Sequence, residues 1–152
     1  MNQETKKDIT EITHDKIDYH QLTEDIRSNQ AGAAILFLGT VREFTKGQQT
    51  TALDYEAYPE MAIAQMKELI KQAREKWPVI HAGIIHRLGH LELGEISVAV
   101  AISTPHRGES FEAGQFLIDQ LKIHVPVWKK ENWSDGTTEW VHPTGEDTVP
   151  TK

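Results

Sequence analysis

Cationic side chains gather in one C-terminal segment of this chain. His106 and Arg107 precede a predicted helix, Lys122 lies near the end of that helix, and Lys129 and Lys130 follow it. The formal net charge of the whole chain is −7, so the average composition does not account for this cluster. A cationic surface in an acidic protein concentrates anionic ligands locally. The segment is therefore a candidate binding site for an anion.

The His106-Arg107 pair stands between the end of a predicted strand and a helix expected to begin with Ser110 as its cap. Backbone N–H groups at a helix N-terminus favour anions, and a guanidinium adds a bidentate donor. A solvated turn, in which Arg107 pairs with Glu109 or Glu112, would also account for the pair. The dipeptide alone leaves both interpretations open.

Lys122 falls on the flank of the apolar stripe of the same predicted helix, four residues after Ile118. Desolvation there would lower its pKa and make it a candidate acid, base or nucleophile. The alternative is a packed stem with its ammonium in water. Lys129 and Lys130 follow Trp128 on a predicted strand, so they point to opposite faces and one of them can approach Lys122. Two lysines protecting an exposed strand edge would look the same in sequence.

Arg42 ends the segment Gly39-Thr-Val-Arg42, which joins a predicted strand to a loop. Loops at strand ends often carry functional groups. A surface ion pair of Arg42 with Glu43 or Glu56 is the simpler alternative.

No metal site and no cofactor are expected. The chain has eight histidines, but the pair His86 and His90 is interrupted by Gly89, and neither an HExxH motif nor a carboxylate-rich frame accompanies it. Phosphate-binding glycine loops and a GxSxG nucleophile motif are absent from the sequence. Cysteine is absent as well, which excludes disulfides, thiolate ligands and a cysteine nucleophile in this chain.

The elements that must position these residues alternate between strands and helices. The clearest is a helix that begins at Pro59, places Met66 and Leu69 on one apolar face and ends before Pro78. Hairpin signals at both ends of the chain favour an α+β domain with a mixed sheet. Helices are predicted at 18–28, 59–77 and 110–124, strands at 8–16, 32–39 (buried), 52–57, 79–85, 95–103, 128–133 and 137–141, and a mobile loop at 44–51.

The length of 152 residues suits one domain, expected at 8–142 between a polar tail at 1–7 and a loose C-terminal tail at 143–152. The N-terminus has no apolar run of the kind a secretory signal needs, and no stretch approaches the roughly 20 apolar residues of a membrane span. With cysteine absent, these features favour a cytoplasmic protein. The acidic balance argues against nucleic acid as its main partner.

Several short motifs occur together in the order typical of one family. They are Gly39-Thr-Val-Arg42, Tyr58-Pro59, His86-Arg-Leu-Gly89, His106-Arg107, Phe111-Glu-Ala113 and Lys122-x3-Pro126-x-Trp128-Lys129-Lys130-Glu131. Over residues 32–141 the chain resembles the large, catalytic subunits of molybdopterin synthase. The resemblance implies an α/β hammerhead fold with an additional small antiparallel β subdomain.

The resemblance also implies an activity and an assembly. The family's enzymes are sulfurtransferases of molybdenum cofactor biosynthesis. Sulfur passes from the thiocarboxylated Gly-Gly C-terminus of a small ubiquitin-like subunit to cyclic pyranopterin monophosphate, which forms the dithiolene of molybdopterin. Two large subunits form a homodimer within a heterotetramer.

The site residues implied by the resemblance fall on the motifs quoted above. Lys122 and Lys129 take the places of the catalytic lysines. The binding positions correspond to Thr40, Val41, Arg42, His106, Arg107, Lys122, Lys129, Lys130 and Glu131.

One departure concerns the C-terminal segment, from which the family can send an arginine into the neighbouring protomer. Here the last arginine is Arg107, so this chain lacks that group. Two rival hypotheses remain at this stage: a non-catalytic module of the same fold that binds a pterin or a sulfur carrier, and an anion-binding regulatory domain. Both Lys122 and Lys129 are present, which favours the enzyme, since binding alone would not need a lysine on the flank of the helix.

Overall fold

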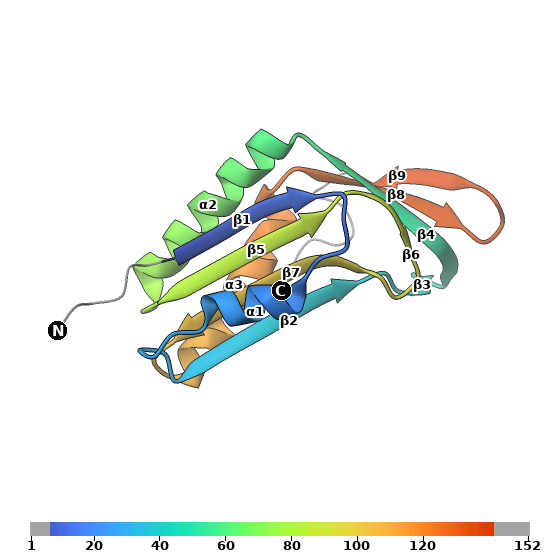
Figure 1. Ribbon diagram of the computed structural model, residues 1–152. Helices are drawn as coiled ribbons and strands as arrows, with labels where there is room; N and C mark the ends of the chain where they lie inside the picture. Colours follow the sequence, from blue (N-terminus) through green and yellow to red (C-terminus); the bar gives the residue numbers. More distant parts are fainter. Residues whose placement is uncertain (1–6, 142–152) are drawn as a thin grey trace.

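A four-stranded mixed sheet carries most of the hydrophobic core. The computed structural model describes residues 7–141 (Figure 1), so the residues expected to form tails lie outside it, apart from Lys7, which begins the first strand. One strand pair is parallel and the other two are antiparallel, which confirms the mixed sheet and the α+β class. The strand order is β1 (Lys7–Thr13), β5 (His81–Arg87), β7 (Ile96–Thr104) and β2 (Ala33–Thr40).

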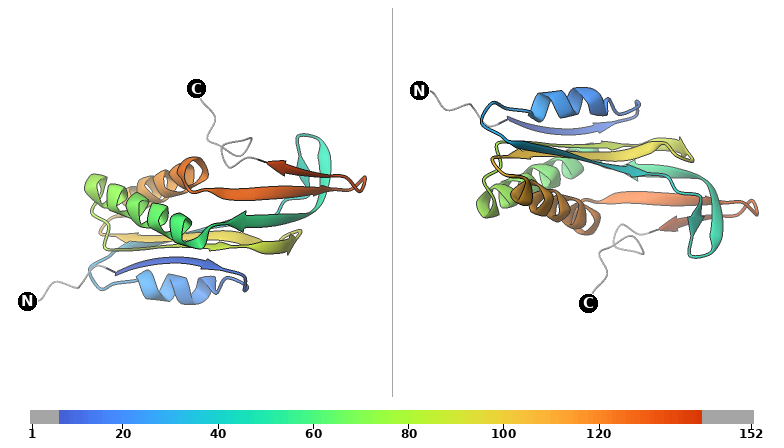
Figure 2. Two further views of the ribbon diagram at one scale, coloured as in Figure 1. Left: turned by 90° about the horizontal axis from the view of Figure 1, so that it is seen from above. Right: turned by 90° about the horizontal axis from the view of Figure 1, so that it is seen from below.

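Helices cover both faces of this sheet (Figure 2). Helices α2 (Pro59–Lys76) and α3 (Arg107–His124) lie on one side, and α1 (Tyr19–Ile26) lies on the other. The alternation of side chains in β5 and β7 serves both layers, because neighbouring residues of a strand point to opposite faces. Ile84 and Val100 pack under α2 and α3, whereas Ile85 and Ala101 pack against α1. None of the described helices is long and apolar enough to cross a membrane.

A smaller antiparallel sheet extends beyond the first one, as the family resemblance of the chain predicted. Its central strand β4 (Gln48–Ala57) pairs with β8 (Val127–Trp133) along one edge and with the short β6 (Gly89–Glu92) along the other. The β8 strand continues as a hairpin into β9 (Thr138–Val141), where Gly136 takes the positive φ of 89° that the turn requires. This confirms the predicted closing hairpin.

The strand expected at 32–39 is present as β2, but its predicted burial and the predicted loop at 44–51 were wrong. Residues 32–39 were expected to form a buried strand, but β2 is an edge strand with no fully buried residue. Its apolar run is explained by helices on both faces of the sheet, while its outer edge remains exposed. Residues 44–51 were expected to be a loop but belong to a hairpin of β3 (Phe44–Thr45) with β4. Lys46 and Gly47 have φ values of 50° and 82°, which suit a two-residue hairpin turn.

The start of α3 also differs from the prediction. The helix begins at Arg107 with His106 in the capping position, three residues before the predicted start at Ser110. Ser110 is fully buried inside the helix, where its hydroxyl donates a hydrogen bond to the Arg107 carbonyl at 2.8 Å. Ser110 was expected to cap the helix, but its side chain bonds within the helix instead. As a consequence, His106 and Arg107 are fixed at the N-terminal end of α3.

Candidate active site

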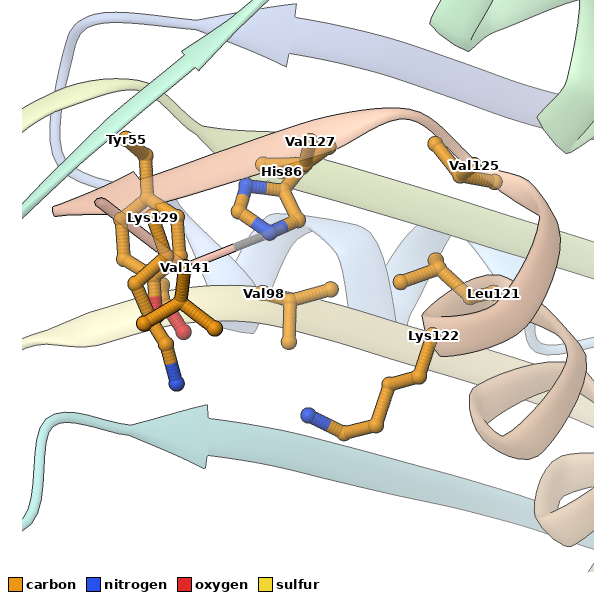
Figure 3. A pocket seen from close by; sticks show the side chains of 10 residues that line it. Tyr55, His86, Val98, Leu121, Lys122, Val125, Val127, Lys129 and Val141 are labelled. Atoms are coloured by element: carbon orange, nitrogen blue, oxygen red, sulfur yellow. The ribbon is translucent and has the colours of Figure 1, made fainter. Parts of the chain in front are cut away.

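Two lysines from different elements enter one hollow where the two sheets meet. Lys122 comes from the last turns of α3 and Lys129 from β8, and Figure 3 shows them on opposite sides of the hollow with Val98 between them. An adjoining hollow shares both lysines and continues towards Arg42 and Glu131. We call the two hollows together the lysine pocket.

Lys122 is held by the packing of the helix that carries it. Its neighbour Leu121 is buried in the core, and Lys122 itself is half-buried on the flank of that apolar face, as predicted. Burial lowers the pKa of the Lys122 ammonium below its ordinary value, and the positive charge of Arg42 lowers it further. A lysine in this state can exchange protons more readily than a solvated one.

Lys129 and Glu131 point into the pocket from the same face of β8. Lys129 Nζ lies 3.7 Å from Glu131 Oε2, and the two side chains are only 12% and 3% exposed. The other carboxylate oxygen of Glu131 accepts a hydrogen bond from the Thr50 hydroxyl at 2.9 Å. Burial lowers the pKa of Lys129, with smaller lowering contributions from Lys122 and Arg42, while Glu131 opposes the shift. Glu131 therefore offsets part of the repulsion among the cations.

Lys130 lies on the opposite face of β8, as the alternation predicted. Its Nζ is 3.7 Å from Asp54 Oδ2 and sits 5.9 Å from the centre of the Trp140 ring. Within one chain, Lys130 therefore contacts this surface and not the lysine pocket.

The segment that carries Arg42 is anchored by its neighbour. Thr40 and Arg42 line the pocket, but the Val41 side chain is 3% exposed and packs with Leu53 and Leu91. The Val41 N–H donates to the Glu95 carbonyl at 3.0 Å, and the Val41 carbonyl accepts from the Gly94 N–H at 2.8 Å. Val41 thus anchors the segment through its buried side chain and its two backbone hydrogen bonds.

His106 and Arg107 are not brought to the lysines within one chain. Arg107 begins α3 and Lys122 lies near its end, so a rise of about 1.5 Å per residue separates them by about 22 Å. The pair borders a separate hollow with Gly32. The alternative partner Glu112 instead accepts a hydrogen bond from Trp77 Nε1 at 3.0 Å.

Comparison with known proteins identifies the family. The model of the MoaE protein family matches residues 12–124. The chain belongs to the MoaE family. It is 43% identical to the molybdopterin synthase catalytic subunit of Halalkalibacterium halodurans over 86% of this chain and 83% of that protein. The Bacillus subtilis subunit of the same name is 41% identical, with 91% and 88% covered.

Solved structures agree with this assignment to the MoaE family. Molybdopterin synthase from Staphylococcus aureus superposes with a TM-score of 0.80 at 39% identity, covering 85% of this chain and 93% of that one. A complex of subunits 1 and 2 of the molybdopterin-converting factor from Helicobacter pylori superposes with a TM-score of 0.67 over 95% and 93% of the two chains. At 19% identity, that likeness shows the fold alone. The family resemblance inferred from the sequence motifs is confirmed.

His86 and Tyr55 line the pocket of this MoaE protein but were not among the predicted site residues. His86 is 5% exposed, and its Nδ1 lies 2.9 Å from the Arg87 carbonyl, which requires a proton on Nδ1. Its ring meets the Tyr55 ring edge-on, with centroids 5.1 Å apart. The sequence placed His86 in a family motif without a role. Tyr55 gave no signal beyond its place in an alternating strand.

The other histidine considered for metal binding lies on the surface. His90 shares hydrogen bonds with Asp54 at 3.0 Å and Glu92 at 2.7 Å, and these two bonds raise its pKa. Within residues 7–141, no group of three or more potential ligand side chains is arranged to hold a metal ion.

His86 makes stability depend on pH in a defined direction. Burial lowers its pKa from 6.5 to about 4. The bond to the Arg87 carbonyl opposes this shift, and the positive charge of Lys122 adds a smaller lowering. The unfolded chain therefore binds more protons between these two values, so the free energy of unfolding falls as the pH drops from 6.5 towards 4. We expect His86 to account for about 3 kcal/mol of this loss.

Urea unfolding at several pH values from 7 to 4 checks this prediction. His86→Gln, which cannot titrate, should flatten the profile relative to wild type, whereas His20→Gln, at an exposed position, should leave the profile unchanged. Parallel profiles for wild type and His86→Gln would contradict the assignment.

Proposed function

We propose that this chain is the catalytic subunit of a cytoplasmic molybdopterin synthase. It would transfer sulfur from the thiocarboxylated C-terminus of a small ubiquitin-like subunit to cyclic pyranopterin monophosphate and so form the dithiolene of molybdopterin. The observation that carries the proposal is the convergence of Lys122 and Lys129, both with lowered pKa values, in a pocket that Arg42 completes. Membership of the MoaE family supports it.

The charges of the pocket suit the two ligands. A thiocarboxylate and a phosphate monoester are both anions. Arg42, Lys122 and Lys129 supply three positive charges, and Glu131 supplies one negative charge, so the pocket retains a net positive charge that favours them. The chain has no cysteine, so the sulfur has to arrive on another molecule.

The chemistry requires proton transfers that the lysines are placed to perform. Each transfer forms a carbon–sulfur bond on the pterin and breaks a carbon–oxygen bond at the same carbon, whose oxygen leaves after taking up a proton. Water then cleaves the carbon–sulfur bond to the partner and returns the partner as a carboxylate. Charged hydrogen bonds from Lys122 and Lys129 would stabilise the anionic sulfur and oxygen atoms. An ammonium with a lowered pKa can also give up a proton more readily than a solvated one.

The remaining predicted residues take different parts in the proposal. Thr40 and Glu131 line the pocket beside Arg42 and would contact ligand there, while Val41 holds the segment in place. Lys130 would act from the outer face of β8, where it contacts Asp54.

His106 and Arg107 would act across a homodimer. Their distance of about 22 Å along α3 from Lys122 means that they cannot complete the pocket of their own chain. We therefore place the pair of each protomer at the pocket of its partner, within a heterotetramer that carries two small subunits. A non-catalytic module that binds pterin or sulfur carrier would hold the same ligands without turnover.

The first prediction separates the enzyme from the binding module. Lys122→Ala and Lys129→Ala should each lower single-turnover sulfur transfer by at least about 100-fold, because each removes a proton-transfer group and an anion-binding charge. Melting temperatures should move little, since Ile118 and Leu121 keep the core intact. The assay uses saturating thiocarboxylated partner and pyranopterin, with Lys71→Ala on the exposed face of α2 as the matched control. Near wild-type rates for Lys122→Ala would refute the catalytic assignment.

The second prediction tests the shared pocket. Differently tagged Lys122→Ala and Arg107→Ala chains are co-expressed, and the mixed dimer is purified. If Arg107 acts in the pocket of its partner, one pocket carries both changes and the other carries neither, so about half of the wild-type activity should return. If Arg107→Ala is impaired on its own and the mixed dimer is no more active than the average of the two single variants, Arg107 acts within its own chain. An unimpaired Arg107→Ala variant would mean that Arg107 takes no part.

A further inference from the structure

The buried ring of His86 stands in the lysine pocket between the two lysines. It lines the same hollow as Lys122 and Lys129, and Figure 3 shows it between them with one ring nitrogen directed into the hollow. The ring is held from two sides, because Nδ1 lies 2.9 Å from the Arg87 carbonyl and the Tyr55 ring meets it edge-on. The position of the second ring nitrogen, Nε2, is therefore fixed as well.

Nε2 is a hydrogen-bond acceptor without a partner in the described part of the chain. A carbonyl can only accept, so the bond to Arg87 places the ring proton on Nδ1 and leaves a lone pair on Nε2. The ring is neutral at pH 7, because burial lowers the pKa of His86 to about 4. No residue in the range 7–141 bonds to Nε2. The fully covered polar side-chain atoms without a partner in that range are Arg87 Nε and Glu109 Oε1, so Nε2 is open to the hollow.

The cations of the pocket leave this acceptor to the ligand. Arg42, Lys122 and Lys129 can only donate, and they are the groups that attract an anion. The carboxylate of Glu131 is already engaged, since it is approached by Lys129 and accepts the hydroxyl of Thr50. A ligand that covered Nε2 without offering a donor would leave a buried acceptor unpaired, which is costly.

A peptide C-terminus carries a donor next to its anionic end. In the last residue, the amide nitrogen and the carboxyl carbon are two bonds and about 2.5 Å apart. An end group held between Lys122 and Lys129 therefore brings its own N–H close to the ring that stands between them. The anion and the donor that this pocket suits arrive together on one ligand.

We propose that Nε2 of His86 accepts a hydrogen bond from the amide N–H of the last residue of the sulfur carrier and so fixes how its C-terminus enters the pocket. The inference rests on the proposed function for the identity of this ligand. His86 is then a binding residue, and the proton transfers remain with the lysines. The last residue of the carrier has to bear an N–H, which excludes proline and N-methylated residues there.

The experiment removes the donor without adding bulk. The small subunit of the native host is prepared by peptide ligation with its last peptide bond either intact or replaced by an ester, which exchanges the N–H for an oxygen. Both forms end in a carboxylate, and calorimetry gives their dissociation constants. The ester should weaken binding to the wild-type protein by about 3- to 10-fold, the loss expected for one hydrogen bond. An ester at the preceding peptide bond is the matched ligand control, and its effect should not depend on residue 86.

His86→Asn completes a double-mutant cycle with the two ligands. The amide of asparagine can still donate to the Arg87 carbonyl but has no atom in the place of Nε2. This variant should bind the intact partner about 3- to 10-fold more weakly than wild type does, and the ester should then cause no further loss. His20→Asn, at an exposed position of α1, is the control variant and should keep the wild-type difference between the two ligands.

Equal affinities of the wild-type protein for the intact partner and the ester would overturn the proposal, whether or not His86→Asn folds. The same ester penalty in wild type and in His86→Asn would overturn it as well, because another group would then hold the N–H. Weaker pyranopterin binding with unchanged partner binding in His86→Asn would assign Nε2 to the pterin instead. Failure of the intact partner to bind the wild-type protein would contradict the proposed function itself.

Discussion

The structure is organised around the difficulty of holding three cations together in a partly dry pocket. Arg42, Lys122 and Lys129 repel one another, and burial lowers the pKa of both lysines. Glu131 supplies the nearest negative charge, and its own burial is offset by the hydrogen bond from Thr50 and by the approach of Lys129. Such a cluster does not stabilise the fold. It persists because other interactions fix the positions of the helices and strands that carry these side chains.

These interactions are apolar contacts in the hydrophobic core. Strands β5 and β7 are covered on both faces by helices, so their alternating side chains fix the large sheet between two apolar layers. The apolar face of α3 then places Lys122 over the edge of that sheet. The pairing of β4 with β8 brings Lys129 to the same place from the small sheet. Catalytic side chains on rigid elements can keep their geometry despite mutual repulsion.

The parts of the site that follow a periodic pattern could be predicted from the sequence. The helical spacing placed Lys122 on the flank of an apolar stripe, and the strand period of two separated Lys129 from Lys130. The separation of His106 and Arg107 from Lys122 already follows from the helix expected between them, which spans about 18 Å from residue 110 to residue 122, but the closeness of these cations in sequence concealed it. The place of Tyr55 in the pocket could not be predicted, since it depends on pairing with Lys129 and on a ring contact with His86, both distant in sequence. The β3–β4 hairpin was missed because Lys46-Gly47 is not one of the common hairpin sequences.

The central claim, that the C-terminus of a sulfur-carrier subunit lies between Lys122 and Lys129, can be tested without any turnover. A partner that ends in an ordinary carboxylate is mixed with this protein and treated with a carbodiimide, which joins a carboxylate to an amine only when the two are in contact. Peptide mapping by mass spectrometry then identifies the linked lysine. The account predicts an isopeptide bond from the terminal glycine of the partner to Lys122 or Lys129, and none to Lys130 on the opposite face of the same strand. A bond to Lys130 or to an α2 lysine such as Lys71, with Lys122 and Lys129 unmodified, would contradict it.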